Sequence, residues 1–195
     1  GGRLQMLTIP SQPGFDTRTN QIIGSKLLAS WVNIPDPNPA SAETNPLAVL
    51  NQGLAQGGAT FTRLEGCFAV LNNIYFTSTN GGNAGRGQIW KYESRKKSKF
   101  GWLTLVYESP AADVLDFPDN ICFGPNGHLF LCEDGSVDNY IRILTRAGAV
   151  SDFAKNIVPG LEATEFTGSV FSPDFQTLFV NVQAAGITLA IWGNW

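Results

Sequence analysis

The sequence predicts an all-β fold, a partial β-propeller of about three four-stranded antiparallel blades. Short apolar runs alternate with turn signals along a chain that is rich in Gly (21) and Pro (11). From residue 61 onward, one pattern of two apolar strands joined by a turn recurs three times. The second strands begin near Ile74, Leu129 and Leu178, which gives a period of about 50 residues. Antiparallel repeats of this length are typical of propeller blades.

The composition excludes several function classes. A chain of 195 residues with 43% hydrophobic residues suits one domain, or a piece of a larger one. The net charge of −3 gives no sign of binding to nucleic acid or to an anionic membrane. No apolar run approaches the ~18 residues of a membrane span. The start, GGRLQMLTIP, has neither the basic nor the apolar region of a signal peptide, so we expect a mature, trimmed or truncated start.

Residues 1–60 are expected to be an irregular, loop-rich segment that leads into the propeller. The stretch WVNIPDPNPASAETNP, at 31–46, is too rich in Pro and Asn for a regular element, and it predicts a long ordered loop. The next stretch, PLAVLNQGLAQGGATF, contains the only plausible short helix. The glycines at 57–58 would stop it.

The repeat predicts three blades within residues 61–195, at about 61–110, 111–158 and 159–195. Their inner strand pairs lie in RLEGCFAVLNNIYFTSTNGG, FPDNICFGPNGHLFLCEDGS and FTGSVFSPDFQTLFVNVQ. Outer strands follow in GQIWKYES with LTLVYES, in YIRILTRAG with VSDFAKN, and in ITLAIWG. A β-sandwich would also give short strands with turns. The matching turn chemistry of the three units favours blades.

Polar side chains gather at one end of these predicted blades. The innermost strand of a blade starts at one face and the second strand returns to it, so residues before the first and after the second strand meet there. The polar residues at these positions are Arg63, Glu65, Asp119, Asn120, Glu165, Ser78, Thr79, Asn80, Glu133, Asp134, Asn181 and Gln183. Clustered carboxylates repel one another unless cations hold them. Carboxylate and amide oxygens are ligands of hard cations such as Ca²⁺.

A simpler interpretation is open for each of these groups. Glu133-Asp134-Gly135 also fits a solvated turn, and Asp119-Asn120 a turn whose side chains bond the backbone. Arg63 and Glu65 could also form an exposed cross-strand ion pair. Glu165 also fits an ordinary surface residue. The basic stretch ESRKKSKF, at 93–100, is interpreted as a solvated hairpin tip.

The numbers and spacing of cysteine and histidine residues exclude several kinds of metal and catalytic site. The spacing of Cys67, Cys122 and Cys132 fits neither a zinc site nor a disulfide framework, and we interpret Cys67 and Cys122 as small apolar core residues. His128 is the only histidine. Zinc sites built on several histidines and His-based catalytic triads are therefore excluded within this chain.

Over most of residues 60–195 the chain resembles a known family. The stretches FTRLEG, IYFTSTNGG, GQIWKYE, LVYESP, FPDNICFGPNGHLFLCEDG, FAKN and EFTGSVFSPDFQTLFVNVQAAGITLAIWGNW are similar to the C-terminal part of the PhoX-like alkaline phosphatases. WVNIPDPNP fits the approach to that part. The resemblance implies an exported, periplasmic or extracellular β-propeller enzyme that hydrolyses phosphate monoesters with iron and calcium in its channel.

The resemblance also implies roles for single residues. Arg63 matches an arginine that binds the phosphate, and Glu65 a glutamate that binds metal. Asp119, Glu133, Asp134 and Glu165 are expected to be further metal ligands or their supporting neighbours. A guanidinium can bind phosphate oxygens bidentately, and clustered cations can take the charge of a phosphoryl group.

The chain also departs from the family pattern. It resembles about the last third of such a protein, and three blades cannot close a propeller, which needs about four to eight. The family's cysteine ligand has no match here, and the ending AAGITLAIWGNW lacks the usual proline. We therefore expect a fragment, completed by blades that are lost or supplied by another chain, with at most traces of phosphatase activity alone.

Two other functions are open at this point. One is a calcium-dependent propeller hydrolase of the lactonase type, in which Arg63 beside Glu65 would have no role. The other is a non-catalytic propeller that binds a partner or a glycan. Metal analysis separates the three functions: iron with calcium favours the phosphatase, calcium alone the lactonase, and neither the binding module.

Overall fold

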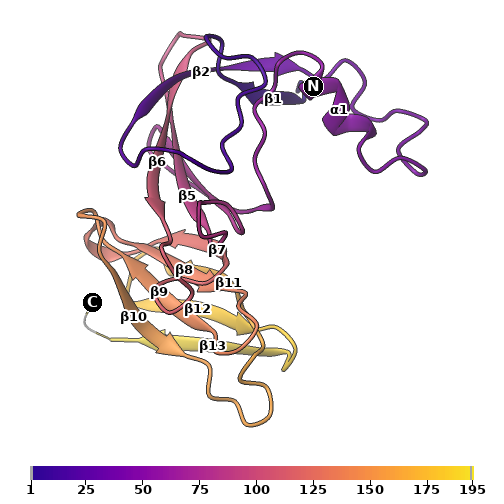
Figure 1. Cartoon of the computed structure of the whole chain (residues 1–195). Coiled ribbons are helices and arrows are strands. Elements are labelled where there is room, and N and C mark those ends of the chain that lie inside the picture. Colours follow the sequence, from indigo (N-terminus) through magenta and orange to yellow (C-terminus); the bar gives the residue numbers. More distant parts are fainter. Residues whose placement is uncertain (1, 194) are drawn as a thin grey trace.

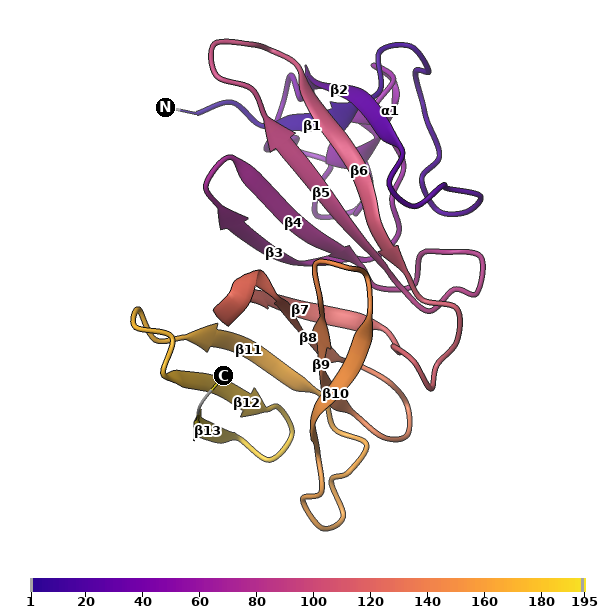
Figure 2. The same ribbon diagram turned by 90° about the vertical axis from the view of Figure 1, so that its left-hand side faces the viewer.

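The computed structural model describes residues 2–193 and 195, whose strands form three antiparallel sheets. The sheets follow one another along the molecule, with the first at the top of the ribbon in Figure 1 and the other two below it. Figure 2 shows the strands that begin the three predicted blades, Leu64–Val70, Pro118–Phe123 and Phe166–Phe171, one below another. No helix among the described residues is long and apolar enough to cross a membrane.

The first sheet has six strands in the order β1-β2-β6-β5-β4-β3. Its strands are β1 (Gln5–Thr8), β2 (Lys26–Asn33), β3 (Leu64–Val70), β4 (Asn73–Ser78), β5 (Gln88–Ser94) and β6 (Gly101–Glu108). Strands β3 to β6 form the blade that the sequence predicts. The helix α1 (Ala48–Leu54) lies where we predicted one, and it ends before Gly57.

The N-terminal segment is more regular than we expected, because β1 and β2 extend the first sheet beyond β6. Strand β2 pairs with β6 from Lys26 opposite Thr104 to Ala29 opposite Gly101. Ala29 is fully buried in a core cluster with Leu103 and Trp90. This burial explains why an apparent leader segment is an integral part of the sheet.

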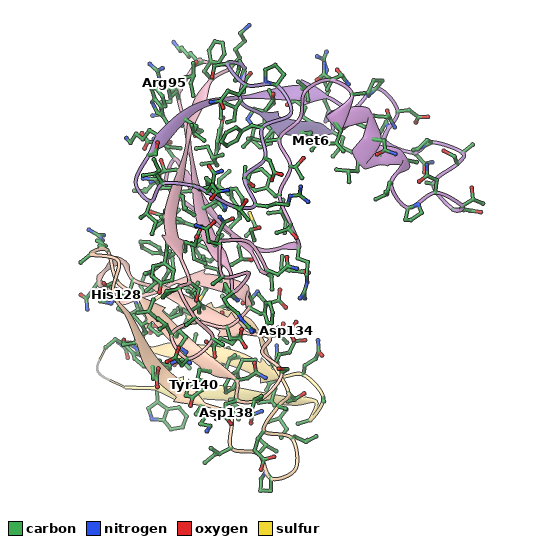
Figure 3. All side chains as sticks on the ribbon, viewed as in Figure 1. Met6, Arg95, His128, Asp134, Asp138 and Tyr140 are labelled. Carbon is green, nitrogen blue, oxygen red and sulfur yellow. The ribbon has the colours of Figure 1, made fainter. Side chains whose placement is uncertain are left out.

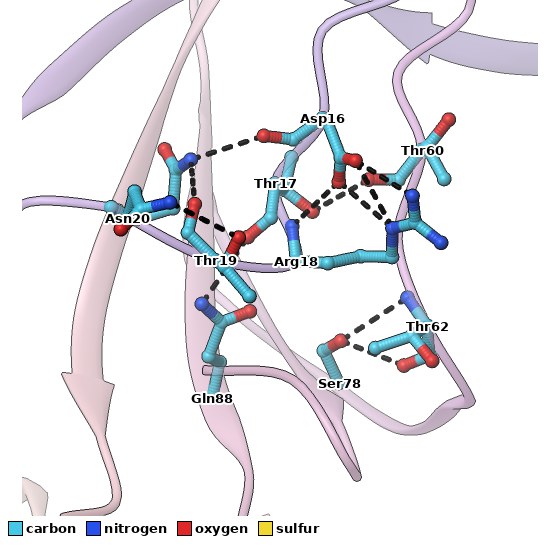
Figure 4. Close-up of polar contacts among 10 residues, drawn as sticks. Asp16, Thr17, Arg18, Thr19, Asn20, Thr60, Thr62, Ser78 and Gln88 are labelled. Atoms are coloured by element: carbon cyan, nitrogen blue, oxygen red, sulfur yellow. Dashed lines mark hydrogen bonds and ion pairs between the residues drawn. The ribbon is translucent and has the colours of Figure 1, made fainter. Parts of the chain in front are cut away.

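Polar contacts tie the loop after β1 to the same sheet (Figure 4). The backbone N–H and the hydroxyl of Thr17 both donate to the carbonyl oxygen of Thr60, at 3.0 and 2.8 Å. The buried Gln88 amide on β5 donates to the Thr17 carbonyl oxygen at 3.2 Å. Asp16 accepts from the guanidinium of Arg18, and this ion pair is exposed.

The second and third sheets are meanders of consecutive strands. The second has the order β10-β9-β8-β7, with β7 (Pro118–Phe123), β8 (Leu129–Glu133), β9 (Tyr140–Leu144) and β10 (Val150–Lys155). The short 3₁₀ turn η1 (Pro125–Gly127) joins β7 to β8. The third sheet has three strands, β11 (Phe166–Phe171), β12 (Thr177–Val182) and β13 (Ile187–Trp192).

The first strands of the three units lie side by side, which is the arrangement of propeller blades. Strand β7 contacts β3 on one side and β11 on the other. Apolar clusters fill the space between successive sheets, with Ile121 in the cluster next to the first sheet and Cys122 in the cluster next to the third. The predicted partial β-propeller is therefore confirmed, and three successive sheets replace the two facing sheets of a sandwich.

A β-bulge recurs at the same place in each unit. One extra residue interrupts the pairing between Leu64 and Cys67 in β3, between Pro118 and Ile121 in β7, and between Thr167 and Val170 in β11. In the first two units the residue before the strand, Arg63 or Phe117, has a left-handed backbone, with φ of 42° and 48°. Bulges bend a strand and redirect its side chains, so they determine where polar groups point at this end of the sheets.

Candidate metal centre

Three carboxylates from two different sheets meet at the end of the blades where the sequence placed ligands. Asp119 lies in the bulge of β7, Asp134 directly follows β8, and Glu165 directly precedes β11. One oxygen of each lies within 4.8 Å of the others, and all three side chains are half-buried. We call Asp119, Asp134 and Glu165 the acidic cluster.

Contacts of β3 and β4 with the backbone of β7 fix the position of Asp119. The Thr77 hydroxyl donates to the Asp119 carbonyl oxygen at 2.9 Å and accepts from the Gly66 N–H, also at 2.9 Å. A Cβ atom on Gly66 would lie 2.3 Å from that same carbonyl oxygen. Only glycine lets β3 approach β7 this closely, which gives the Gly of the RLEG motif a structural reason.

A second set of contacts joins β7 to β11 beside the acidic cluster. The Asn120 side-chain oxygen accepts from both the N–H and the hydroxyl of Ser169, each at 2.8 Å. Asn120 and Ser169 both lie in the bulges of their strands. The bulges thus hold the second and third sheets together at the level where Asp119 and Glu165 meet.

Arg63 is the cation next to the acidic cluster. Its guanidinium donates to the Asp134 carboxylate at 3.1 Å, with 44% of the Arg63 side chain and 36% of the Asp134 side chain exposed. The sequence suggested Glu65 as an alternative ion-pair partner, but the partner of Arg63 is Asp134. The exposed part of the guanidinium leaves N–H groups open to an anion from solvent.

The acidic cluster favours the binding of protons or cations. Burial raises the pKa of Asp119, and the charge of Asp134 adds to this effect, while the hydrogen bond with Glu165 and the charge of Arg63 oppose it. Burial likewise raises the pKa of Glu165 to about 7, with help from Asp134 and Asp119. The Oε2 atom of Glu165 is buried and has no hydrogen-bond partner among the described residues. A divalent cation would satisfy this oxygen and relieve the repulsion.

The donor set of the acidic cluster fits calcium better than iron, because all of its ligand atoms are carboxylate oxygens. His128 precedes β8 and Asp134 follows it, and the two lie on opposite sides of the ribbon in Figure 3. Cys132 is buried in the core cluster between the second and third sheets, and burial raises the pKa of its thiol to about 12. Neither residue belongs to the cluster.

Glu133, which we expected to be a metal ligand, has other partners. Its side chain is fully buried, and its carboxylate accepts from the N–H groups of Asp116 and Tyr140, at 2.9 and 3.0 Å, and from Arg142 at 2.8 Å. These donors match a structural ion pair rather than a metal site. The alternation of β8 explains the difference, since Glu133 and Asp134 are neighbours and point to opposite faces.

Glu65 also lies outside the acidic cluster, among the described residues. It occupies the same bulge position in β3 that Asp119 occupies in β7, and its side chain is exposed. The repeat thus places a carboxylate at equivalent positions of two blades, but only that of Asp119 meets other carboxylates. Glu65 lines an apolar cavity of the first sheet instead.

The burial of two residues near the candidate site was not predicted correctly from the sequence. Arg142 is 5% exposed, packs over the Tyr140 ring at 4.0 Å and pairs with both Glu133 and Asp152. An arginine between two isoleucines in YIRIL was the available signal for a buried cation. Cys122 is buried as predicted, but the prediction was wrong for Cys67, which is exposed because its face of β3 borders the cavity.

Comparisons with known proteins give one family and one type of solved structure. The model of the family described as alkaline phosphatase PhoX matches residues 1–186. A search of curated proteins gave no match. Selenomethionine-substituted virginiamycin B lyase from Staphylococcus aureus aligns at 18% identity and a TM-score of 0.40, over 86% of this chain and 48% of that one.

A catalytically inactive variant of the same lyase with quinupristin aligns at 17% identity and a TM-score of 0.40. That alignment covers 100% of this chain and 57% of the lyase. The chain therefore spans about half the length of the solved structures that it matches.

Proposed function

This chain belongs to the PhoX alkaline phosphatase family, and from this premise we propose that it is the part of a metal-dependent phosphomonoester hydrolase that binds the phosphate. The proposal rests on one observation above all. An arginine with open N–H groups, Arg63, lies 3.1 Å from a member of a three-carboxylate cluster. A cation site beside a guanidinium is the arrangement that phosphate ester hydrolysis needs.

In the proposed mechanism, Arg63 binds the phosphate. A guanidinium presents paired N–H donors that match two phosphate oxygens, and it carries its charge at every physiological pH. Asp134 holds the Arg63 side chain in place by accepting one of its hydrogen bonds. Arg63 would thus orient the phosphorus atom relative to the acidic cluster.

The acidic cluster would hold the cation. Asp119, Asp134 and Glu165 are the proposed ligands, and calcium bound there would offset the negative charge of the phosphoryl group. Without a cation, Asp119 and Glu165 favour a shared proton, because burial disfavours two charges at this distance. A proton and a cation therefore compete for the same oxygens.

One observation favours a second candidate function. The acidic cluster contains oxygen donors alone, which is also what a calcium-dependent lactonase-type hydrolase would show. The iron that the family resemblance implied has no thiol or imidazole ligand in this cluster. Iron binding, Glu65 as a ligand, export to the periplasm or the exterior, and completion of the propeller by further blades stay proposals.

The proposed function can be tested on the complete protein that contains these residues. Asp134→Asn removes one ligand charge, so we expect the calcium content and the turnover of a chromogenic phosphate ester to fall together. Asp138→Asn is the matched control, since Asp138 lies in the same loop but pairs with Lys155. Calcium retained in full by Asp134→Asn would contradict the proposed site, and turnover of lactones but not phosphate esters would favour the second candidate.

A further inference from the structure

A large cavity lies against the first sheet, outside the acidic cluster. Its volume is about 760 Å³, and residues of β1, β2, α1, β3, β4 and β5 line it. This size lies within the range of small-molecule sites, about 300–1,000 Å³. The cavity is therefore large enough to hold most of a small organic ligand.

The lining of the cavity is almost entirely apolar. Met6, Trp31, Leu50 and Phe76 are among the residues that face it, from four different elements. The Trp31 ring N–H donates to the Tyr92 hydroxyl at 3.0 Å, so these two polar groups satisfy each other within the wall. Such a lining binds hydrocarbon or aromatic groups and offers few partners to a polar guest.

The cavity reaches the segment that directly follows the proposed phosphate-binding residue. Leu64, Glu65 and Gly66 line it, and Arg63 directly precedes them in the chain. Consecutive Cα atoms are about 3.8 Å apart, so the backbone of Arg63 adjoins that of Leu64, a lining residue. Gly66 is also the residue that touches the Asp119 backbone. One short segment thus connects the apolar wall with the acidic cluster.

We propose that the cavity binds the apolar part of a phosphate monoester, an alkyl or aryl group, while Arg63 binds its phosphate. This inference rests on the proposed function and names its substrate class. Burial of the hydrocarbon would provide binding free energy that the small, polar acidic cluster cannot provide. Esters with polar alcohols, such as sugar phosphates, would lack this contribution.

A series of alkyl phosphates tests the inference. The binding of inorganic phosphate and of ethyl, butyl, hexyl and octyl phosphate to the chain is measured by calorimetry with calcium present. Each methylene group that enters the cavity should tighten binding about fourfold. The fluorescence of Trp31, which lines the cavity, should change with the long esters and not with inorganic phosphate.

A pair of variants, one in α1 and one at the residue just before it, assigns the effect to the cavity. Leu50 lines the cavity and is 44% exposed, whereas Leu47 is 51% exposed and does not line it. Leu50→Gln should flatten the dependence on alkyl length and leave the affinity for inorganic phosphate unchanged. Leu47→Gln should leave both unchanged. Because both residues are exposed, we expect both variants to stay folded.

The outcomes separate the inference from the proposed function. If inorganic phosphate binds and longer alkyl chains add no affinity, the cavity is not an ester site, but the proposed function still stands. The same result is expected if another part of the complete protein fills the cavity. Octanol that binds as tightly as octyl phosphate would overturn both. A length dependence that persists in Leu50→Gln would also overturn the inference.

Discussion

Arg63 donates a hydrogen bond to Asp134 at 3.1 Å, across 71 positions of the sequence, and thereby links the first sheet to the second beside the acidic cluster. Both side chains are substantially exposed. Exposed ion pairs contribute about 0–1 kcal/mol to stability, so this pair has little value for folding. Its position next to Asp119 and Glu165 is better explained by a role in binding.

The first prediction concerns Arg63→Ala in the complete protein. We expect the turnover of phosphate esters to fall about 10²-fold, because loss of one charged donor to a phosphoryl group typically costs ~3 kcal/mol of transition-state stabilisation. The free energy of unfolding should change by less than about 1 kcal/mol. Turnover and denaturant unfolding measured on the same preparations check both values.

Arg18→Ala is the control for this change. Arg18 forms an exposed ion pair with Asp16, remote in sequence from the acidic cluster, so its loss should leave turnover intact. Unchanged turnover in Arg63→Ala would remove the phosphate-binding role. The lactonase-type hydrolase and the binding module would then be the better candidates.

The second prediction separates Glu133 from its neighbour Asp134. Glu133→Ala should lower the free energy of unfolding by about 3–5 kcal/mol, because it leaves the buried Arg142 without its main partner. The exposed pair of Asp138 and Lys155 provides the control, and Asp138→Asn should cost less than about 1 kcal/mol. Urea unfolding measures both, and equal costs would contradict the structural role assigned to Glu133.

The position of the candidate site could be predicted from the sequence because it follows from topology. Residues that end β8 or precede β11 lie at the same end of their blades, so Asp134 and Glu165 were expected to meet Asp119, and they do. The face to which each side chain points was harder to predict. Glu133 is adjacent to Asp134 but turns inward to Arg142, and this depended on a buried partner nine residues away.

The N-terminal part of the fold could not be read in the same way. Strand β2 pairs with β6, which follows it by about 70 residues, so no local turn signal announces it. The bulges were also not predicted, although they redirect Glu65 and Asp119. Contacts over long sequence distances decide both features, whereas the hairpins of the repeat are local and were predicted.

The third prediction concerns Gly66. An alanine here would place its Cβ 2.3 Å from the Asp119 carbonyl oxygen and 2.8 Å from the Ile121 nitrogen, and both are backbone atoms that cannot turn away. We expect Gly66→Ala to cost about 1–3 kcal/mol of stability and to weaken calcium binding by displacing Asp119. A Cβ on Gly193 meets no atom within 4 Å, so Gly193→Ala is the control. Calcium affinity that matches the control would show that the contact of β3 with β7 does not position the acidic cluster.

The last prediction concerns pH and calcium together. The pKa of Glu165 rises from its usual 4.5 to about 7 in the folded chain, chiefly through burial. Without calcium, the folded state therefore binds a proton more tightly than the unfolded state. The contribution of Glu165 to the stability of the folded state should therefore be greatest below pH 4.5. It should decline as the pH rises from 4.5 through 7.

Calcium should reverse this dependence, because it binds the ionised carboxylates and replaces the proton. The increase in melting temperature on adding calcium should be large at pH 8 and should vanish near pH 5. At a calcium concentration 100 times Kd the gain corresponds to about 2.7 kcal/mol.

Glu165→Gln cannot ionise, so it should flatten the pH dependence of the calcium-free chain and reduce the calcium effect. Glu162→Gln, at an exposed position three residues earlier, should behave like the unmodified chain. A calcium effect as large at pH 5 as at pH 8 would mean that calcium binds elsewhere than at Glu165.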